Sequence, residues 1–381
     1  MLLGVPKEIK ADENRVGLTP SSVREVIENG HQVIVETGAG AGIDFDDDAY
    51  RSAGAEIVDG AKTVFDRAEM IVKVKEPQPS ETAMLHHDQV LFTYLHLAPD
   101  PKQTDGLQQS GATAIAYETV TSPRGGLPLL APMSEVAGRM AVQAGARCLE
   151  KIMGGRGLLL GGVPGVGPAR VAVLGGGVAG GNALRIAVGM GADVTVLDKS
   201  LTRLAQLDDL YGSRVKTVYS TTESVEQAVV EADLVIGTVL LPGAAAPKLV
   251  KRDMLKRMKP GSVIVDVSVD QGGCCETTRA TTHHEPTYIV DDVVHYCVAN
   301  MPGAVARTST MALNNATLPF VLKLANRGVW QALADDPHLL NGLNVCRGAI
   351  TFEAVARDLG REYVDPNQFL NGGHGPEAAV A

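Results

Sequence analysis

An apolar run enters a glycine-rich turn at residues 171–180 (VAVLGGGVAG), and this combination limits the possible folds of the chain more than any other stretch. The turn reads G-x-G-x-x-G, with glycines at Gly175, Gly177 and Gly180, and a helix-like segment follows it. The first glycine permits a tight turn, the second lets the backbone approach a pyrophosphate, and the third lets helix and strand pack closely. The pattern therefore predicts a strand, turn and helix that bind a dinucleotide.

An acidic residue stands where such a unit needs one. The next apolar strand, 193–197, ends at Asp198. A carboxylate there accepts hydrogen bonds from ribose hydroxyls and repels a 2′-phosphate, so the sequence predicts NAD as the cofactor rather than NADP. The pyrophosphate would lie at the helix N-terminus, whose free N–H groups favour an anion. A glycine-rich turn that binds nothing is the alternative, and the strand, helix and acid around the motif argue against it.

Length and charge limit the class of protein. A chain of 381 residues predicts two domains, and a net charge of −10 without a basic run argues against nucleic acid or an anionic membrane as partner. Charged residues follow too soon after Met1 for a signal peptide, and no apolar run reaches the roughly 18 residues of a membrane-spanning helix. We therefore expect a cytoplasmic protein.

The cysteine pattern indicates reduced thiols. There are five cysteines and no C-x-x-C pair, which is not a disulfide framework. One short span holds the metal-capable residues Cys274, Cys275, His283, His284, His295 and Cys297. A zinc site is the alternative there. The usual ligand spacings are absent and adjacent cysteines do not easily face one ion, so we expect no metal.

The order of predicted elements indicates the architecture. Strands are expected at 2–5, 32–36, 70–74, 90–94 and 113–117, and then, after a Pro- and Gly-rich crossing and a helix over 134–152 capped by Ser134, at 171–174, 193–197, 215–219, 233–238, 262–267 and 287–290. After about residue 305 the pattern is helical, at 310–327, 329–335 and 353–359, with no strand nearby in the sequence.

These helices are expected to return to the first domain. The prediction is an α/β protein with two Rossmann-like doubly wound domains, in which one domain is inserted into the other. The NAD-binding domain spans 129–305, and the discontinuous substrate domain comprises 1–128 and 306–381.

Residues suited to catalysis follow several predicted strands. A dehydrogenase needs an anchor for its substrate and a proton carrier, and in parallel sheets such groups lie beyond the carboxyl ends of strands. Arg15 suits a carboxylate, Lys75 a carboxylate or carbonyl, and His96 a proton transfer. Asp270 follows the strand 262–267. Each has an alternative role. Arg15 could form a surface ion pair with Asp12 or Glu13, Lys75 could be a solvated lysine, His96 a structural histidine and Asp270 a turn-forming aspartate.

Eight dispersed stretches, in order along the chain, resemble the family of L-alanine dehydrogenase and the transhydrogenase nucleotide-binding subunit. They are GVPKE (4–8), NRVGLTP (14–20), GAG (38–40), VKVKEP (72–77), YLHLA (94–98), PMSEVAG (132–138), DVSVDQGG (266–273) and ANMPGAV (299–305). The similarity covers nearly the whole chain and fails only in about the last ten residues. It agrees with an inserted NAD domain.

The resemblance implies NAD-dependent, reversible oxidative deamination of L-alanine to pyruvate and ammonia. By similarity, Arg15 and Lys75 bind the substrate, and His96 and Asp270 carry protons. Besides the fingerprint glycines, the residues implied to line the NAD site are Ser134, Val178, Ala179, Asp198, Arg203, Ser220, Val239, Leu240, Val267, Asp270, Asn300 and Met301.

Departures and rivals accompany this resemblance. Arg203 stands where lysine is common, and either cation suits the adenosine side of NAD. Lys323 and Arg327 replace an acid and a histidine that carry a metal in some relatives, so no metal is expected there. Family members are commonly homohexamers. The rival functions are the NAD(H)-binding subunit of a proton-translocating transhydrogenase, a dehydrogenase of another amino acid such as a saccharopine-type enzyme, and a non-catalytic NAD-binding protein.

Overall fold

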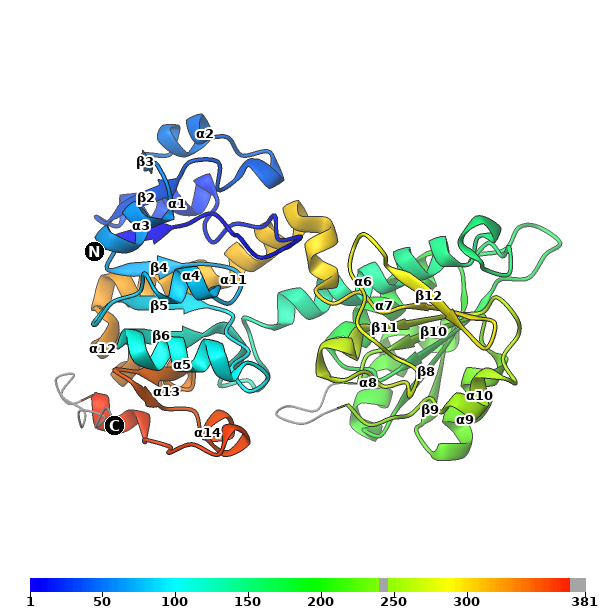
Figure 1. Cartoon of the computed structure of the whole chain (residues 1–381). Coiled ribbons are helices and arrows are strands. Elements are labelled where there is room, and N and C mark those ends of the chain that lie inside the picture. Colours follow the sequence, from blue (N-terminus) through cyan, green and yellow to red (C-terminus); the bar gives the residue numbers. More distant parts are fainter. Residues whose placement is uncertain (240–245, 371–381) are drawn as a thin grey trace. The chain divides into compact units, whose positions relative to one another are not determined.

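The chain folds into two compact units. The computed structural model describes residues 1–239 and 246–370. One unit comprises Met1–Met133 together with the chain from Val305 onward, and the other comprises Ser134–Ala304 (Figure 1). The second unit is thus inserted into the first, and the divisions lie a few residues from the boundaries expected after residues 128 and 305.

The first unit is built on an eight-stranded sheet. The strand order is β15-β14-β6-β5-β4-β1-β2-β3. The strands are β1 (Leu2–Val5), β2 (Gln32–Glu36), β3 (Glu56–Val58), β4 (Met70–Val72), β5 (Val90–Thr93), β6 (Thr113–Ala116), β14 (Leu343–Cys346) and β15 (Ala349–Ile350). β1 to β6 pair in parallel, so their carboxyl ends share one edge of the sheet.

Helices connect these strands, and several begin at a cap that the sequence supplies. Thr19 accepts a hydrogen bond from Ser22 N and precedes Pro20, and Asp100 caps the helix that begins at Pro101 in the same way. The helices of this unit are α1 (Pro20–Glu28), α2 (Asp47–Ser52), α3 (Ala61–Arg67), α4 (Pro79–Thr82), α5 (Pro101–Ser110), α11 (Ala306–Arg327), α12 (Val329–Asp335), α13 (Pro337–Leu340) and α14 (Glu353–Leu359).

The expectation that the C-terminal helices have no strand nearby in sequence is wrong. β14 and β15 lie between α13 and α14, and β14 runs antiparallel to β6. β14 is a four-residue strand (LNVC) that contains a polar residue, so its local pattern is weak. Its pairing with a strand from the N-terminal part ties the C-terminal segment into the first sheet.

The second unit is built on a seven-stranded sheet in the order β12-β13-β11-β10-β7-β8-β9. Its strands are β7 (Arg170–Leu174), β8 (Asp193–Asp198), β9 (Val215–Tyr219), β10 (Leu234–Gly237), β11 (Val263–Asp266), β12 (Thr287–Val290) and β13 (Val293–Tyr296). Its helices are α6 (Ala131–Cys148), whose first turn belongs to the other unit, α7 (Val178–Gly189), α8 (Leu201–Tyr211), α9 (Thr222–Glu231) and α10 (Arg252–Leu255).

Both sheets carry the same strand topology. Counted along the chain within each unit, the first five strands lie in the order 3-2-1-4-5 that is typical of dinucleotide-binding folds. In the first unit the sixth strand, β6, lies next to β5. In the second unit the seventh strand, β13, takes that place parallel to β11, and the sixth, β12, is added antiparallel at the edge. The expected α/β class with two doubly wound domains is confirmed.

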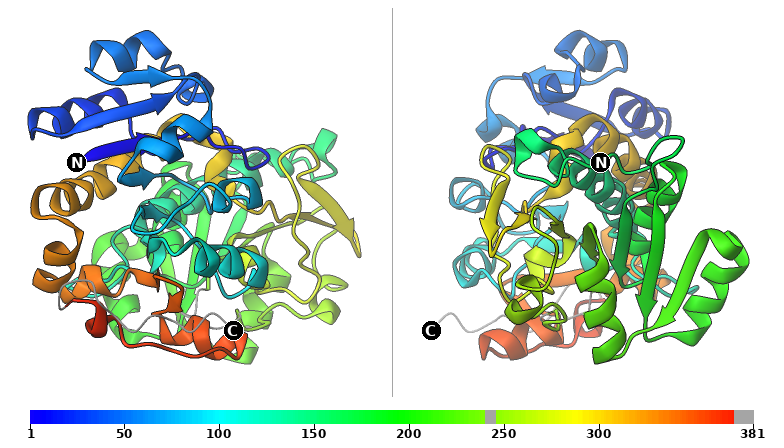
Figure 2. Two further views of the ribbon diagram at one scale, coloured as in Figure 1. Left: turned by 60° about the vertical axis from the view of Figure 1, so that its left-hand side comes forward. Right: turned by 90° about the vertical axis from the view of Figure 1, so that its right-hand side faces the viewer.

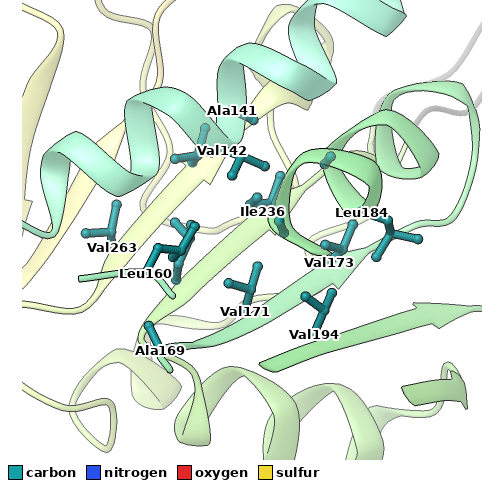
Figure 3. Close-up of a cluster of buried hydrophobic side chains, with 14 of the residues drawn as sticks. Ala141, Val142, Leu160, Ala169, Val171, Val173, Leu184, Val194, Ile236 and Val263 are labelled. Atoms are coloured by element: carbon teal, nitrogen blue, oxygen red, sulfur yellow. The ribbon is translucent and has the colours of Figure 1, made fainter. Parts of the chain in front are cut away.

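The core of the second unit explains why its strands are apolar on both faces. Val171 and Val173 of β7 pack in one cluster with Val142 of α6 and Leu184 of α7 (Figure 3). The alternate residues of the same strand pack in a second cluster with Val225 and Val229 of α9. Figure 2 shows helices on either side of these strands. Burial on both faces is the arrangement that continuous apolar strands predict.

Ser134 does not cap a helix. The helix α6 begins at Ala131, so Ser134 lies inside its first turns. Pro132 stands at the second position of the helix, where a missing N–H has no cost. The serine was taken for the start because it is a common cap residue, whereas the proline upstream is the better signal.

Candidate functional site

Arg15, in the loop after β1, is held by a neighbouring carboxylate. Its Nε and Nη2 donate to Oε1 and Oε2 of Glu13 at 2.7 and 2.6 Å, and its Nη1 donates to Sδ of Met133 at 3.0 Å. The side chains of Arg15 and Glu13 are only 2% and 0% exposed. Burial lowers the pKa of the guanidinium, but Glu13 outweighs this and raises it. The pair is therefore buried and oriented, unlike the surface ion pair of the alternative reading.

The backbone that carries Lys75 is fixed by its neighbours. Glu8 Oε1 accepts hydrogen bonds from Val74 N at 2.7 Å and from Lys75 N at 3.4 Å, and Thr93 Oγ1 donates to Lys75 O at 2.9 Å. The side chain of Lys75 is 12% exposed, and its Nζ lies 3.9 Å from Oε2 of Glu76. The position is that of a partly buried cation rather than a solvated one.

Charges around this loop are balanced in pairs. Burial raises the pKa of Glu76, but Lys75 and Lys10 outweigh it and lower that pKa below its usual range. The second lysine of the motif, Lys73, is fully buried and donates to Glu8 at 3.1 Å and to Glu81 at 2.6 Å. Lys73 thus anchors Glu8, which in turn anchors the backbone of Lys75.

His96, after β5, is held by Glu118, after β6. Glu118 accepts hydrogen bonds from Leu95 N at 3.1 and 3.2 Å and from His96 N at 2.6 Å. The ring Nδ1 of His96 lies 3.8 Å from Oε1 of Glu118, and the ring stacks on Tyr94 with 5.8 Å between centroids. His96 adopts φ +50, which a residue with a side chain rarely does. The imidazole, 44% exposed, is therefore fixed in an uncommon backbone conformation by one carboxylate.

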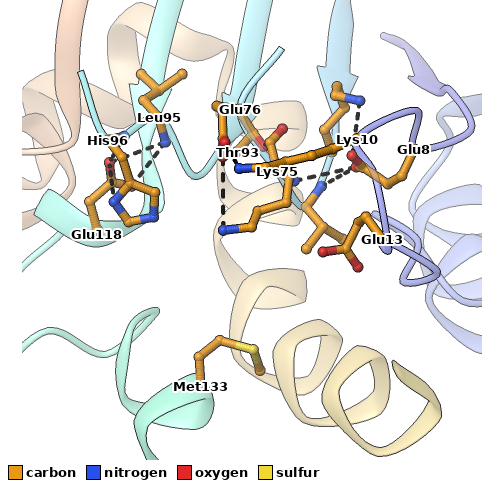
Figure 4. A network of polar contacts seen from close by, with 12 residues as sticks. Glu8, Lys10, Glu13, Lys75, Glu76, Thr93, Leu95, His96, Glu118 and Met133 are labelled. Carbon is orange, nitrogen blue, oxygen red and sulfur yellow. Dashed lines mark hydrogen bonds and ion pairs between the residues drawn. The ribbon is translucent and has the colours of Figure 1, made fainter. Parts of the chain in front are cut away.

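Sheet order brings these residues of the first unit to one edge. β6, β5, β4 and β1 are consecutive neighbours and run parallel. Figure 4 shows Lys75, His96 and their carboxylate partners along this edge, with Met133 nearby. The structure thus groups a buried guanidinium, a partly buried ammonium and an imidazole, which is a set suited to an anionic substrate that exchanges a proton.

The glycines of the fingerprint in the second unit meet the requirements predicted for them. Gly175 has φ +98, and a Cβ on Gly180 would lie 1.9 Å from the carbonyl oxygen of Gly175. Gly177 caps α7, and a Cβ on it would meet no atom within 4 Å. Gly180 therefore serves packing, whereas the space beside Gly177 lies open at a helix N-terminus. This open cradle fits the pyrophosphate of a dinucleotide.

The acidic end of β8 is tied to the same turn. Asp198 Oδ2 accepts a hydrogen bond from Gly176 N at 2.7 Å, and its Oδ1 accepts one from Ser200 N at 2.8 Å. Arg203 Nε donates to the carbonyl oxygen of Gly176 at 2.5 Å. Asp198 and Arg203 thus contact the fingerprint from the side where the sequence predicts the ribose and adenosine.

The other residues implied to line the NAD site are spread over several segments. Ser220, Val239 and Val267 follow β9, β10 and β11, whose carboxyl ends share the edge of β7 and β8. The remaining positions are Val178 and Ala179 in the first turn of α7, Ser134 in α6, Asp270 exposed in the 3₁₀ turn 267–271, Asn300 with φ +60, and buried Met301. Leu240 lies outside the described residues.

α6 packs closely on the fingerprint helix. A Cβ on Gly138 would lie 2.0 Å from the carbonyl oxygen of Ala179. Glycine at this point lets the α6 turn after Ser134 approach the start of α7. The PMSEVAG motif therefore has a packing role that its sequence alone does not reveal.

The metal-capable residues take other partners. In residues 1–239 and 246–370, no group of three or more His, Cys, Asp or Glu is placed to hold a metal ion. Thr277 Oγ1 lies 3.0 Å from Cys275 Sγ and 2.7 Å from His295 Nε2. Lys323 and Arg327 pair with Asp336 and Asp335.

No helix in the described part of the chain is both long and apolar enough to cross a bilayer.

Sequence reasoning missed two of the carboxylates that hold the candidate residues. Glu8 and Glu118 lie close to strand ends but were not singled out, because acids in loops are common and their partners lie after other strands. Glu13 was named only as a surface partner of Arg15, and the structure buries that pair. The one usable signal was that Glu8 and Glu13 stand in or beside stretches already recognised as motifs.

Comparison with known proteins gives a consistent assignment. The family models of the alanine dehydrogenase/PNT N-terminal and C-terminal domains match residues 4–137 and 141–353. Alanine dehydrogenase of Halomonas elongata is 63% identical over 365 residues, 96% of this chain and 98% of that protein. Alanine dehydrogenase of Bacillus subtilis is 58% identical over 371 residues, with 97% and 98% covered.

Solved structures agree with these relatives. An L-alanine dehydrogenase structure superimposes with a TM-score of 0.91 at 55% identity, covering 94% of this chain and 99% of the other. Transhydrogenase from Sinorhizobium meliloti gives a TM-score of 0.80 at 26% identity, with 93% and 100% covered. Because two family models together match most of the chain and the relatives match nearly all of it, this chain belongs to the alanine dehydrogenase/PNT family.

Proposed function

We infer that the protein is an NAD-dependent alanine dehydrogenase, which converts L-alanine reversibly to pyruvate and ammonia. The observation that carries this conclusion is 54–63% identity to several alanine dehydrogenases over nearly their full length. The position of Arg15, Lys75 and His96 after neighbouring strands of the first sheet supports the proposal, because a guanidinium, an ammonium and an imidazole suit an amino-acid substrate.

The first unit supplies the groups for the substrate. Arg15 would bind the carboxylate of alanine, because a guanidinium forms two parallel hydrogen bonds to it. Its orientation is set in advance by Glu13, so little ordering remains to be done on binding. Lys75 would polarise the oxygen that appears as the carbonyl of pyruvate forms.

His96 would carry protons for the water that attacks the iminium and for the ammonia that leaves. Glu118 faces Nδ1 of the ring, so a proton held on Nδ1 leaves Nε2 as the exchanging atom. Glu118 also holds the backbone of His96 in place. Asp270 would place water and balance the positive charge of the iminium.

The second unit would hold NAD, which supplies the hydride acceptor when bound. The open cradle at Gly177 and the start of α7 suit the pyrophosphate, and Asp198 suits the ribose hydroxyls. The carboxylate of Asp198 is already oriented by Gly176 N and disfavours a 2′-phosphate. We therefore assign NAD-binding to this unit and substrate-binding to the other.

One assay tests the function. Purified protein is mixed with NAD and L-alanine at alkaline pH, and NADH absorbance is followed, with D-alanine and larger L-amino acids in parallel. Signal that depends on L-alanine is expected. NAD binding by fluorescence titration without turnover of any amino acid would instead support the transhydrogenase-type subunit. Turnover of a larger amino acid alone would support a dehydrogenase of that amino acid.

We also propose a cytoplasmic homohexamer. The support for this assembly is family resemblance, and the support for the compartment is the set of five free, buried cysteines, which suits a reducing environment. Sedimentation velocity of the purified protein tests the assembly, since a monomer or dimer at assay concentration would contradict it.

A further inference from the structure

The fully buried carboxylate of Asp266 accepts hydrogen bonds from residues on both sides of Asp270 in the sequence. Asp266, the last residue of β11, is 0% exposed. Its Oδ1 accepts a hydrogen bond from Ser268 N at 3.0 Å. Its Oδ2 accepts hydrogen bonds from Cys274 N at 2.9 Å, Cys275 N at 3.3 Å and Thr278 Oγ1 at 2.5 Å. The donors at residue 268 and at 274–278 lie on opposite sides of Asp270.

The segment between these donors is shaped to close on Asp266. Residues 267–271 form one 3₁₀ turn, and Gly272 and Gly273 follow with φ +85 and +75. A Cβ on Gly273 would lie 2.7 Å from Asp266 Oδ2. Only glycine combines that backbone conformation with that close approach. The two glycines therefore return the chain to the carboxylate and leave Asp270 exposed at the turn.

The same segment is seated on the neighbouring strand. Ser268 Oγ donates to the carbonyl oxygen of Val239, just after β10, at 2.7 Å. A Cβ on Gly237 would lie 2.2 Å from Cys274 Sγ, so the thiol fills the space that this glycine leaves. Burial, with the charge of Asp266 nearby, raises the pKa of the Cys274 thiol well above its ordinary value and keeps it neutral. The turn is thus fixed against β10 as well as β11.

The charge of Asp266 is stabilised by N–H and O–H dipoles. All four donors are backbone amides or a hydroxyl, and within the described ranges no lysine or arginine forms an ion pair with it. Each of these donors would be left without its acceptor if the carboxylate were removed from this buried position, and an unsatisfied buried N–H or O–H group is unfavourable. The turn therefore depends on this one side chain.

We propose that Asp266 is a positioning residue that holds Asp270 in place for the reaction. The proposal rests on the proposed function, in which Asp270 places water during deamination, and deepens it by naming the group that fixes Asp270. Asp266 itself is fully buried and acts only through the turn 267–273.

A second buried aspartate provides a matched control. Asp233 precedes β10 at the opposite end of the strands and is 5% exposed. It accepts a hydrogen bond from Arg170 N at 2.9 Å and pairs with Lys259 at 2.9 Å. Substitution of Asp233 by Asn removes a buried carboxylate from the same unit without touching the turn that carries Asp270.

The experiment compares Asp266→Asn and Asp233→Asn in the full chain. In Asp266→Asn an NH2 group replaces one of the two acceptor oxygens, so in either orientation of the amide at least one N–H or O–H donor of the turn faces another donor, and the turn loosens. Hydrogen exchange by mass spectrometry is expected to rise in peptides covering 267–278, and kcat is expected to fall about 100-fold, as a misplacement near 1 Å can cause. Asp233→Asn is expected to lower the unfolding temperature and leave both readouts unchanged.

A double-mutant cycle with Asp270→Asn separates positioning from a general structural effect. If Asp266 acts through Asp270, Asp266→Asn lowers kcat by less than about threefold in the Asp270→Asn background. If the fall in kcat of the double variant equals the product of the falls in the two single variants, the proposal is overturned. Unchanged exchange at 267–278, unchanged kcat in Asp266→Asn, or full activity of Asp270→Asn would each overturn it as well.

A second pair of variants, which leave Asp266 in place, tests the proposal if Asp266→Asn does not fold. Thr278→Val removes one donor to Oδ2, and Thr278→Ser keeps the hydroxyl. We expect kcat to fall several-fold in the first and to recover in the second, and equal values would contradict the proposal. Wild-type protein without L-alanine-dependent NADH formation would refute the proposed function instead, and hydrogen exchange would still report on the turn.

Discussion

Replacing Glu118 by alanine should impair turnover severely while leaving NAD binding intact. Glu118 makes two contacts with His96 and one with the residue before it: its carboxylate accepts the backbone N–H groups of Leu95 and His96 and faces the ring Nδ1 of His96. Without it, the imidazole loses both its backbone anchor and its ring partner. The fingerprint lies in the other unit, so the cofactor site should not respond.

The size of the effect follows from these contacts. Hydrogen bonds to a charged group contribute about 1.5–3 kcal/mol each, and solvent replaces part of this at a side chain that is 14% exposed. The left-handed backbone of His96, at φ +50, adds about 1 kcal/mol of strain that the carboxylate no longer offsets. A net loss of about 2–4 kcal/mol in the competent arrangement corresponds to a fall in kcat of about 30- to 900-fold.

The assay measures kcat and KM for L-alanine and, separately, the NAD dissociation constant by fluorescence titration. Glu118→Gln is the intermediate control, because its amide oxygen can still accept a hydrogen bond from one of the two N–H groups. The kcat of this variant should fall about tenfold. Turnover of Glu118→Ala within about fivefold of wild type would show that Glu118 does not position His96, since water would then replace the carboxylate fully. An equal loss of NAD affinity would also contradict this role.

Three further predictions concern the cofactor site and the fold. Asp198→Ala should weaken NAD binding and relax discrimination against NADP, measured as the ratio of kcat/KM values, and an unaltered ratio would remove this assignment. Gly177→Ala should keep the unfolding temperature but weaken NAD binding, because the new Cβ meets only the space for the pyrophosphate, whereas Gly180→Ala should also lower the unfolding temperature because its Cβ overlaps a carbonyl oxygen. Lys73→Met should destabilise the protein by about 3–5 kcal/mol in chemical denaturation, since two buried carboxylates lose their cation. Burial lowers the pKa of Lys73, but the two carboxylates outweigh burial and raise that pKa. The stabilisation by Lys73 should therefore be complete below the ordinary pKa of 10.5 and be lost as pH rises above that value. A difference in unfolding free energy between wild type and Lys73→Met that does not change with pH would contradict this origin.

The elements that the sequence predicted well are those whose signal is local. β1, β2, β9 and β12 have the predicted bounds, and α1 begins at the predicted cap. β13 follows β12 after a two-residue turn, and the sequence analysis predicted no strand there. β14 was missed because what makes it a strand is its pairing with β6, far away in the sequence.

The candidate site was predictable as a list of residues but not as an arrangement. Arg15, Lys75 and His96 were proposed from their positions after strands and from the family resemblance. Their fixed orientations depend on Glu13, Glu8 and Glu118, and these contacts arise from the order of strands in the sheet, which residue spacing does not encode. The role of Asp266 was hidden for the same reason, because its partners become neighbours only when the turn closes.

Hydride transfer from the α-carbon of L-alanine to NAD can be followed with an isotope. L-alanine deuterated at Cα is incubated with NAD and the protein, and the products are identified by mass spectrometry. Deuterium is expected in the reduced nicotinamide, with pyruvate and ammonia formed in equal amount. Reduced cofactor without deuterium, or deuterium that remains on alanine while NAD is bound, would contradict it.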